Sequence, residues 1–264
     1  MPLEQKYLDL IRVAVPGVNE EKVLNRLSGL FDLVVETNQR INITSLVSPI
    51  DVTIKHLIDS LTLLSVPEVK ALMDRGVNSC DIGCGGGFPG LPIACAYPEI
   101  SLTMIDSTAK KIAALKENAE KLGLHSVCGI SGRGEELASA KSGVYREKFQ
   151  LCFSRAVARL PVLCELCLPF VEVGGLFAAM KGLQAEEEVK ESLRAIPMLG
   201  GKLFDVRELK IDLDYDSSSD FSAEELEKIR DFSSASRYIV LIEKRKKSLD
   251  VYPRTWAQMT KKTL

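Results

Sequence analysis

The sequence predicts an α/β fold in which helices cover both faces of a doubly wound, mostly parallel β-sheet. A helical appendage precedes this sheet, and a C-terminal β-hairpin closes it. Three features support this class. The first 75 residues show helical apolar spacing, short apolar strands then alternate with helical segments, and the last two predicted strands have no clear helix between them. Alternating strands and helices give parallel pairing with helices on both faces.

The predicted appendage covers residues 1–75. Within residues 20–39, apolar side chains recur at the spacing of one helix face. They are Val23, Leu24, Leu27, Leu30, Phe31, Val34 and Val35. Residues 48–64 predict another helix, in which Ser48 caps the first turn, Pro49 occupies it and Asp51 suits its positive end.

Residues 76–244 carry the alternating pattern. Strands are predicted in "VNSCDI", "SLTMID", "SVCGI", "FQLCFSRA" and "GLFAAMK", and helices in "LPIACAY", "STAKKIAALKENAEKLGL", "LPVLCELCLPFV" and "QAEEEVKESLRAI". The last two strands, "KLFDVRELKI" and "RYIVLIEK", flank an acidic, Ser-rich segment at 212–236. We expect this segment to be a flexible insertion with a short helix, and the two strands to pair as a hairpin.

A glycine-rich loop follows the first predicted strand. The segment "DIGCGGGFPG", residues 81–90, contains five glycines. Asp106 ends the second strand, 23 residues after Gly83. Ligands of open parallel sheets bind beyond the carboxyl ends of the strands, and a carboxylate there can accept both ribose hydroxyls. Together, the loop and Asp106 predict a site for an adenosine-type nucleoside.

The loop alone leaves the kind of nucleoside open. Gly85, Gly87 and Gly90 satisfy G-x-G-x-x-G, which favours a nicotinamide or flavin nucleotide and hence an NAD(P)-type oxidoreductase. Asp81, at the strand end, would repel a pyrophosphate but attract a sulfonium or an amino group. The helical appendage and the hairpin also differ from a plain dinucleotide-binding fold. S-adenosylmethionine therefore fits better.

The composition indicates a compartment and a type of partner. The sequence has no apolar run of 18 residues and no signal peptide, and its seven cysteines are scattered. We expect a monomeric cytoplasmic protein with reduced thiols and no membrane contact. From Arg237 to Leu264, eight Lys/Arg and two acidic residues give +6, which leaves −8 for the rest of a chain with net charge −2.

This charge asymmetry predicts that the basic tail, residues 245–264, contacts a polyanion through its phosphates and does not affect cofactor affinity. Two alternatives remain open: a tail that only aids solubility, and a non-catalytic RNA- or ribosome-binding protein.

Several segments together resemble one family. "NITSL", "KHLIDSL", "DIGCGGGFPGLPIA", "MIDSTAKKIAAL", "SRAVA", "AMKG" and "RYIVLIEK" occur in the order and spacing of bacterial 16S ribosomal RNA guanine-N7 methyltransferases, also called glucose-inhibited division protein B. The resemblance runs from about Phe31 to Lys244. It implies a Rossmann-like class I methyltransferase domain at 76–244, S-adenosylmethionine as cofactor, and 16S rRNA or the assembled small subunit as substrate.

The resemblance also implies roles for single residues. Gly83 and Phe88 would line the methionine part of the cofactor, Asp106 and Ser107 would bind its ribose, and Gly134 and Glu135 would contact its adenine. Arg155 would lie at the mouth between cofactor and RNA. The chain departs from the family at Gly85-Gly86-Gly87, where members carry Gly-Pro-Gly, and in the tail segment "RTWAQMTKK".

Methyl transfer to guanine N7 needs no general base, because N7 has a free lone pair and no proton to lose. We therefore expect alignment to dominate catalysis. Arg155, Lys181 and Arg133 lie near predicted strand ends and are candidates for donating to guanine O6. His56 and Asp59 share a helix face, where they either shape the cleft or make a helix-packing hydrogen bond. Cys164 and Cys167 form a lone C-x-x-C, which predicts no metal site.

Overall fold

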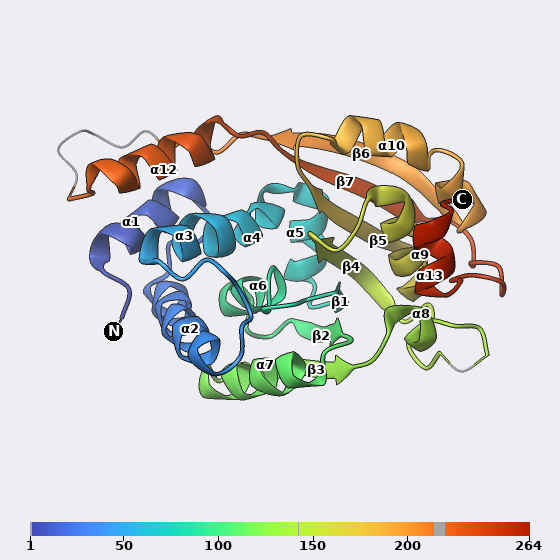
Figure 1. Cartoon of the computed structure of the whole chain (residues 1–264), viewed down its shortest axis with the longest axis horizontal. Helices are drawn as coiled ribbons and strands as arrows, with labels where there is room; N and C mark the ends of the chain where they lie inside the picture. Colours follow the sequence, from blue (N-terminus) through green and yellow to red (C-terminus); the bar gives the residue numbers. More distant parts are fainter. Residues whose placement is uncertain (1, 142, 214–219) are drawn as a thin grey trace.

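The computed structural model describes residues 2–141, 143–213 and 220–264, and Figure 1 shows them arranged around one twisted sheet. The strands described are β1 (Asn78–Ile82), β2 (Ser101–Asp106), β3 (Val127–Ser131), β4 (Phe149–Arg155), β5 (Val171–Lys181), β6 (Gly201–Leu209) and β7 (Arg237–Lys244). They lie in the order β3-β2-β1-β4-β5-β7-β6. β1 to β5 pair in parallel, whereas β7 runs antiparallel to both β5 and β6. The predicted α/β class and closing hairpin are confirmed.

Helices cover both faces of the sheet, each over its own apolar core (Figure 1). On one face lie the N-terminal helices, α6 (Gly90–Ala96) and α7 (Ala109–Lys121). The other face carries α8 (Gly134–Leu137), α9 (Leu160–Cys167) with the 3₁₀ turn η3 (Leu168–Phe170), α10 (Ala185–Ser192), α11 (Ala195–Met198) and α13 (Trp256–Lys261). Alternation along β5 sends Leu176 and Ala178 to the first core and Phe177 and Ala179 to the second.

The N-terminal 75 residues are helical wherever they are regular, as predicted. They form α1 (Gln5–Ala14), α2 (Glu21–Arg40), α3 (Pro49–Val52), the π-helical η1 (Thr53–Ile58), α4 (Asp59–Leu61), the 3₁₀ turn η2 (Thr62–Ser65) and α5 (Pro67–Asp74). The predicted cap is confirmed, because Ser48 Oγ accepts a hydrogen bond from Asp51 N at 3.2 Å.

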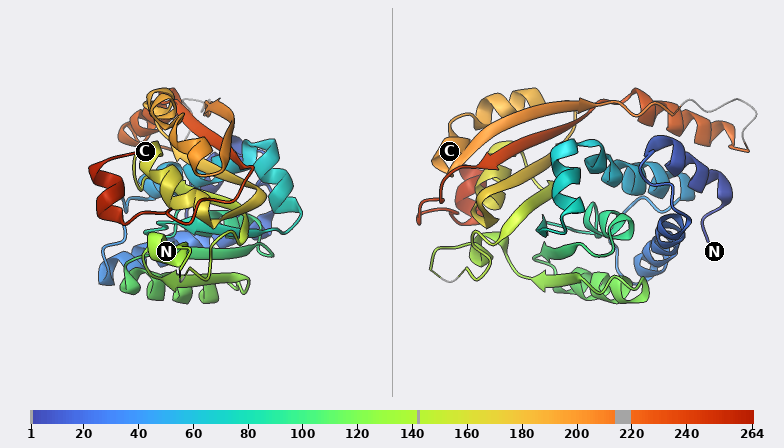
Figure 2. Two further views of the ribbon diagram at one scale, coloured as in Figure 1. Left: turned by 90° about the vertical axis from the view of Figure 1, so that its right-hand side faces the viewer. Right: turned by 180° about the vertical axis from the view of Figure 1, so that it is seen from behind.

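The expected short helix of the insertion is present as α12 (Ala223–Ser234), which begins with a capping box at Ser222. Residues 214–219 of the insertion lie outside the described part of the chain. Figure 2 shows α12 beside the N-terminal helices, and the end of this helix adjoins the start of β7, where Arg237 Nη1 donates to Phe232 O at 3.0 Å. Lys228 on α12 pairs with Asp51 at 3.0 Å, and Glu225 accepts from the Tyr7 hydroxyl. The insertion and the appendage are therefore packed together.

Candidate active site

A cavity of about 470 Å³ lies beyond the carboxyl ends of β1 and β2. This volume is within the range of small-molecule sites. Residues from six separate segments line it: Ile82, Gly83, Gly85, Ile105, Asp106, Ser107, Lys111, Gly132, Arg133, Gly134, Glu135, Ala156, Val157, Leu166 and Trp256. Gly83, Gly85 and Asp106, on which the predicted nucleoside site depends, all line this cavity, and nucleoside binding here stays a prediction.

The glycine loop brings its backbone against the end of β2. Gly83 and Gly85 have φ of 73° and 54°, in the left-handed region that favours glycine. Gly83 N donates to Ile105 O at 2.8 Å, and Gly85 N donates to the Asp106 carboxylate at 3.0 Å. A Cβ on Gly83 would lie 2.4 Å from Val157 Cγ2, whereas the nearest atom to a Cβ on Gly85 is 3.8 Å away. Gly83 is thus required by packing, while Gly85 borders open space.

The Asp106 carboxylate is held in place by two backbone amides. Oδ2 accepts from Gly85 N, and Oδ1 accepts from Thr108 N at 2.8 Å. Each carboxylate oxygen has a second lone pair, so both remain able to accept from vicinal hydroxyl groups. Ser107, adjacent to Asp106, also lines the cavity.

The start of α8 also borders the cavity, where Gly134 and Glu135 line it. Glu135 Oε1 accepts from Trp256 N at 3.3 Å and lies 3.7 Å from Arg133 Nη1. Sequence reasoning missed Trp256, because nothing in the tail pattern indicates that the chain returns to α8.

Asp81 lies beneath the loop and does not line this cavity. It is fully buried, and its Oδ2 accepts from Gly90 N at 2.9 Å. Burial raises the pKa of Asp81 to about 7, and its Oδ1 has no hydrogen-bond partner among the described residues. The position gives Asp81 a role in holding the loop. A direct cofactor contact by Asp81 stays a prediction.

Phe88 also lies outside the lining of this cavity. Its ring stacks on His56 with centroids 4.3 Å apart and planes at 10°, and the Arg155 guanidinium carbon lies 5.6 Å from the ring centroid. Phe88 therefore contacts the neighbouring site, and its predicted contact with the methionine part of the cofactor stays a prediction.

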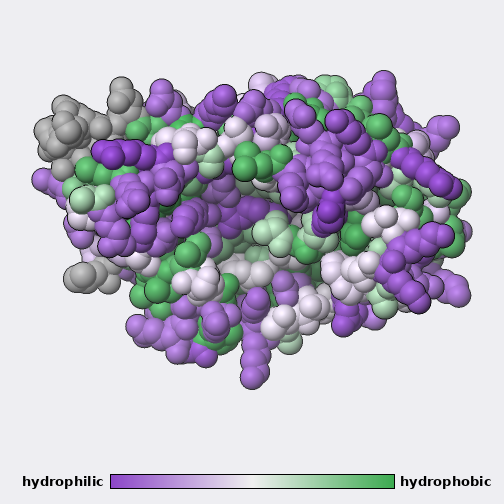
Figure 3. All heavy atoms as spheres, turned by 45° about the horizontal axis from the view of Figure 1, so that its top comes forward, coloured by the Kyte–Doolittle hydropathy of each residue, from purple (hydrophilic) through white to green (hydrophobic). Residues whose placement is uncertain are grey.

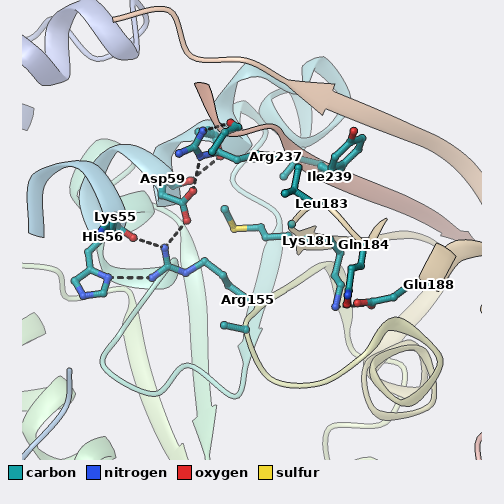
Figure 4. Close-up of a pocket in the computed structure, with 16 residues that line it drawn as sticks. Lys55, His56, Asp59, Arg155, Lys181, Leu183, Gln184, Glu188, Arg237 and Ile239 are labelled. Atoms are coloured by element: carbon teal, nitrogen blue, oxygen red, sulfur yellow. Dashed lines mark hydrogen bonds and ion pairs between the residues drawn. The ribbon is translucent and has the colours of Figure 1, made fainter. Parts of the chain in front are cut away.

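A second cavity, of about 700 Å³, adjoins the first, and Ala156 lines both. Ala156 has φ of 57°, a conformation that non-glycine residues rarely adopt and that concentrates at functional sites. The second cavity lies between η1, the carboxyl ends of β4 and β5, and the start of β7. Figure 4 shows the cationic side chains that project into this cavity.

Arg155 is held by contacts from both of its terminal nitrogens. Its Nη1 donates to Asp59 Oδ2 at 2.6 Å and to the carbonyl of Lys55 at 2.8 Å, and its Nη2 lies 3.4 Å from His56 Nδ1 (Figure 4). Asp59 Oδ1 accepts from Arg237 Nε at 2.9 Å. His56 and Asp59 thus both line the cavity.

His56 is a neutral imidazole at neutral pH. Its burial, together with the nearby Arg155, lowers the pKa of His56 to about 4. A neutral ring has one acceptor and one donor nitrogen. Nδ1 can accept from Arg155 while Nε2 donates to Thr44 Oγ1 at 2.8 Å. His56 therefore orients Arg155 without adding a competing positive charge.

Lys181 lies in the same cavity as Arg155, and Arg133 does not. Lys181 Nζ pairs with Glu188 Oε2 at 2.6 Å and donates to Ala158 O at 2.9 Å. Arg133 lines the first cavity and is largely exposed. Arg237 was missed as a site residue. Because β7 is antiparallel, its first residue meets the carboxyl ends of the parallel strands.

The strand order, the glycine loop after β1 and the carboxylate at the end of β2 define a Rossmann-like class I methyltransferase. An O-methyltransferase from Bacillus cereus solved in complex with S-adenosylhomocysteine shares this fold, with a TM-score of 0.51, 13% identity, and coverage of 81% of this chain and 90% of that one.

The chain belongs to the family of rRNA small subunit methyltransferase G, whose model matches residues 23–214. It is 38% identical to the ribosomal RNA small subunit methyltransferase G of Desulforamulus reducens, over 85% of this chain and 83% of that protein. The enzyme of the same name from Clostridium novyi is 36% identical over the full length of both chains. The resemblance seen in the sequence motifs is confirmed.

Proposed function

We propose that this protein transfers a methyl group from S-adenosylmethionine to N7 of a guanine in the 16S rRNA of the small ribosomal subunit. The observation that carries this proposal is the junction at Ala156, where a nucleoside-sized cavity meets a cation-lined one. Family membership supports the same reaction and does not favour an NAD(P)-type oxidoreductase or a non-catalytic ribosome-binding protein.

The residues of the first cavity fit S-adenosylmethionine. Asp106 offers two oriented oxygens to the ribose hydroxyls, and Gly85 leaves room for a ligand beside its backbone. Ser107 borders the ribose position, and Gly134 and Glu135 border the adenine position. When bound, the cofactor supplies an electrophilic methyl carbon on a positively charged sulfur.

The second cavity suits a guanine turned out of its helix, which proteins bind in enclosed pockets. Three of the five N–H donors of Arg155 are directed at Lys55, Asp59 and His56. The remaining donors can bind guanine O6 and leave the N7 lone pair free. Lys181 adds a second fixed cation. The protein then has only to align N7 with the methyl carbon, with no proton to remove.

The division of the chain follows from this arrangement. We propose residues 76–244 as the methyltransferase domain, 1–75 as the appendage that closes the substrate cavity, and 245–264 as the tail. No described helix is long and apolar enough to cross a membrane. We propose a monomer that works in the cytoplasm, where its rRNA substrate is found.

The test is methyl transfer from tritiated S-adenosylmethionine to small subunits that lack the modification, and separately to naked 16S rRNA. Nucleoside mass spectrometry should find 7-methylguanosine with the wild-type protein. Arg155→Ala should give little product while retaining S-adenosylhomocysteine binding in titration calorimetry. Binding of NADH but not of S-adenosylhomocysteine would favour the oxidoreductase, and cofactor binding without any transfer would favour the ribosome-binding alternative.

A further inference from the structure

The C-terminal tail forms part of the cofactor cavity. Trp256, at the start of α13, lines the cavity together with Leu166 of α9 and Glu135 of α8, and its backbone N–H donates to Glu135. It is also the only tryptophan of the sequence. Sequence reasoning expected the tail to contact phosphates and to leave the cofactor alone, and this position favours a different role.

Buried ionic contacts fix the tail in this position. Glu165 is 1% exposed, and its Oε1 accepts from Arg254 N at 2.9 Å and Nε at 2.8 Å, while Oε2 accepts from Arg254 Nη2 at 2.6 Å. This two-pronged geometry sets direction as well as distance. The contact with Glu165 also holds the backbone at Arg254, two residues before Trp256.

Further contacts extend along the tail on both sides of Arg254. Arg146 donates to the carbonyls of Tyr252 and Ser248 at 2.8 and 2.7 Å. Trp256 N donates to Glu135, and the Met259 side chain is fully buried against α9. The tail is therefore a packed part of the domain up to α13.

We propose that Trp256 is a cofactor-binding residue whose indole stacks on the adenine, held there by the Glu165–Arg254 ion pair. The inference rests on the proposed function, since it assumes that S-adenosylmethionine occupies the first cavity. The indole and Leu166 offer an apolar surface, while Glu135 and the backbone at Gly134 offer polar groups at its edge. An apolar surface with polar groups beside it suits a purine, whose faces stack and whose edges form hydrogen bonds.

The test uses the fluorescence of the full-length protein, because its tryptophan emission comes from Trp256 alone. Titration with S-adenosylhomocysteine should change the emission saturably, with the same Kd as calorimetry. Adenosine alone should produce the same spectral change at higher concentration, because the proposed contact involves only the adenine.

Variants then separate stacking from mere tail packing. Trp256→Ala should raise the Kd for S-adenosylhomocysteine about 5- to 150-fold, the range expected for loss of base–aromatic stacking. Trp256→Phe should restore most of the affinity, because it keeps an aromatic face. Arg254→Lys should weaken binding by a smaller factor, because lysine cannot make the two-pronged contact. Lys261→Ala, at an exposed position on the same helix, is the control and should bind S-adenosylhomocysteine with the wild-type Kd.

Calorimetric binding without a fluorescence change, or an unchanged Kd in Trp256→Ala, would overturn the inference and leave the proposed function intact. Absence of S-adenosylhomocysteine binding to the wild type would instead overturn the cofactor assignment itself. If circular dichroism shows that Trp256→Ala does not fold, Arg254→Lys and the wild-type emission still decide the question. Wild-type affinity for S-adenosylhomocysteine in Arg254→Lys, together with a wild-type emission that does not change on titration with this ligand, would reject the stacking role.

Discussion

Asp59 joins two cations that lie far apart in the sequence. One oxygen accepts from Arg155 at the end of β4, and the other from Arg237 at the start of β7. The shared carboxylate fixes the directions of both guanidinium groups. Such fixed donors need no reorganisation when a substrate binds, which is the main advantage of a preorganised site.

Asp106 gives a prediction about cofactor affinity. Asp106→Ala should weaken S-adenosylhomocysteine binding, because up to two charge-assisted hydrogen bonds to the ribose are lost, each about 1.5–3 kcal/mol at most. Calorimetry measures the change. Glu120→Ala removes an exposed carboxylate on α7 and should leave the Kd at its wild-type value. Wild-type affinity in a folded Asp106→Ala protein would contradict the assignment.

Asp81 gives a prediction about pH and stability. Its pKa is raised by burial from 3.8 to about 7, so the folded state holds this proton more tightly than the unfolded state. The stability that this group contributes is fully present below pH 3.8 and is lost as the pH rises through about 7. The difference corresponds to about 4 kcal/mol.

Asp81→Asn keeps an acceptor for Gly90 N and cannot ionise. The free energy of unfolding of Asp81→Asn, minus that of the wild type, should therefore increase as the pH is raised from about 4.5 to about 7.5. Urea unfolding of the cofactor-free proteins at both pH values measures this difference, and other titrating groups cancel because both proteins contain them. Glu120→Gln should show the wild-type dependence. Parallel pH profiles for Asp81→Asn and the wild type would refute the explanation.

The glycine loop is the element whose geometry sets the shape of the first cavity. Gly85→Val should abolish S-adenosylhomocysteine binding while the protein still folds, because a branched side chain resists φ of 54° and would extend into the open space beside Gly85. Gly83→Ala should instead lower the melting temperature, since its Cβ would overlap Val157. Calorimetry and thermal melts distinguish the two effects, and normal binding by Gly85→Val would make the loop purely structural.

Elements were more predictable from the sequence than contacts between them. The strands, the helix cap at Ser48 and the carboxylate at Asp106 follow from local periodicity and from where parallel strands end. Arg237 and Trp256 could not be found this way, because their places depend on the antiparallel direction of β7 and on the return of the tail to α8. Arg133 illustrates a further limit, since lying at a strand end does not decide which cavity a side chain enters; its predicted role stays a prediction.

The whole molecule must contact rRNA, a polyanion, although its own net charge is −2. Hydrophilic side chains dominate the face shown in Figure 3. Four of the tail cations counted from Arg237 are in ion pairs: Arg237, Lys244, Arg245 and Arg254. The other four, Lys246, Lys247, Lys261 and Lys262, are exposed. These lysines are the part of the tail available to phosphates.

Replacing the four exposed lysines with alanine should raise the apparent KM for small subunits and reduce the slope of log K against log salt by up to about 3. The Kd for S-adenosylhomocysteine should not change. Arg155→Ala should instead lower turnover and leave the salt slope nearly unaltered. Methyl transfer at several salt concentrations measures both variants. Truncation after Lys244 is a poorer test, because it removes Trp256 as well. A wild-type slope in the lysine variant would make the tail lysines solubilising only.

The central position of β7 matters while the protein is being synthesised. β7 leaves the ribosome after the six other described strands, yet it lies between β5 and β6 and pairs with both. A nascent chain that ends before Arg237 therefore has an unpaired edge on β5 and a β6 without that neighbour. Open edges of this kind recruit strands from other chains. A late nonsense mutation should consequently yield an aggregation-prone polypeptide that the cell degrades, and not a shortened enzyme with residual activity.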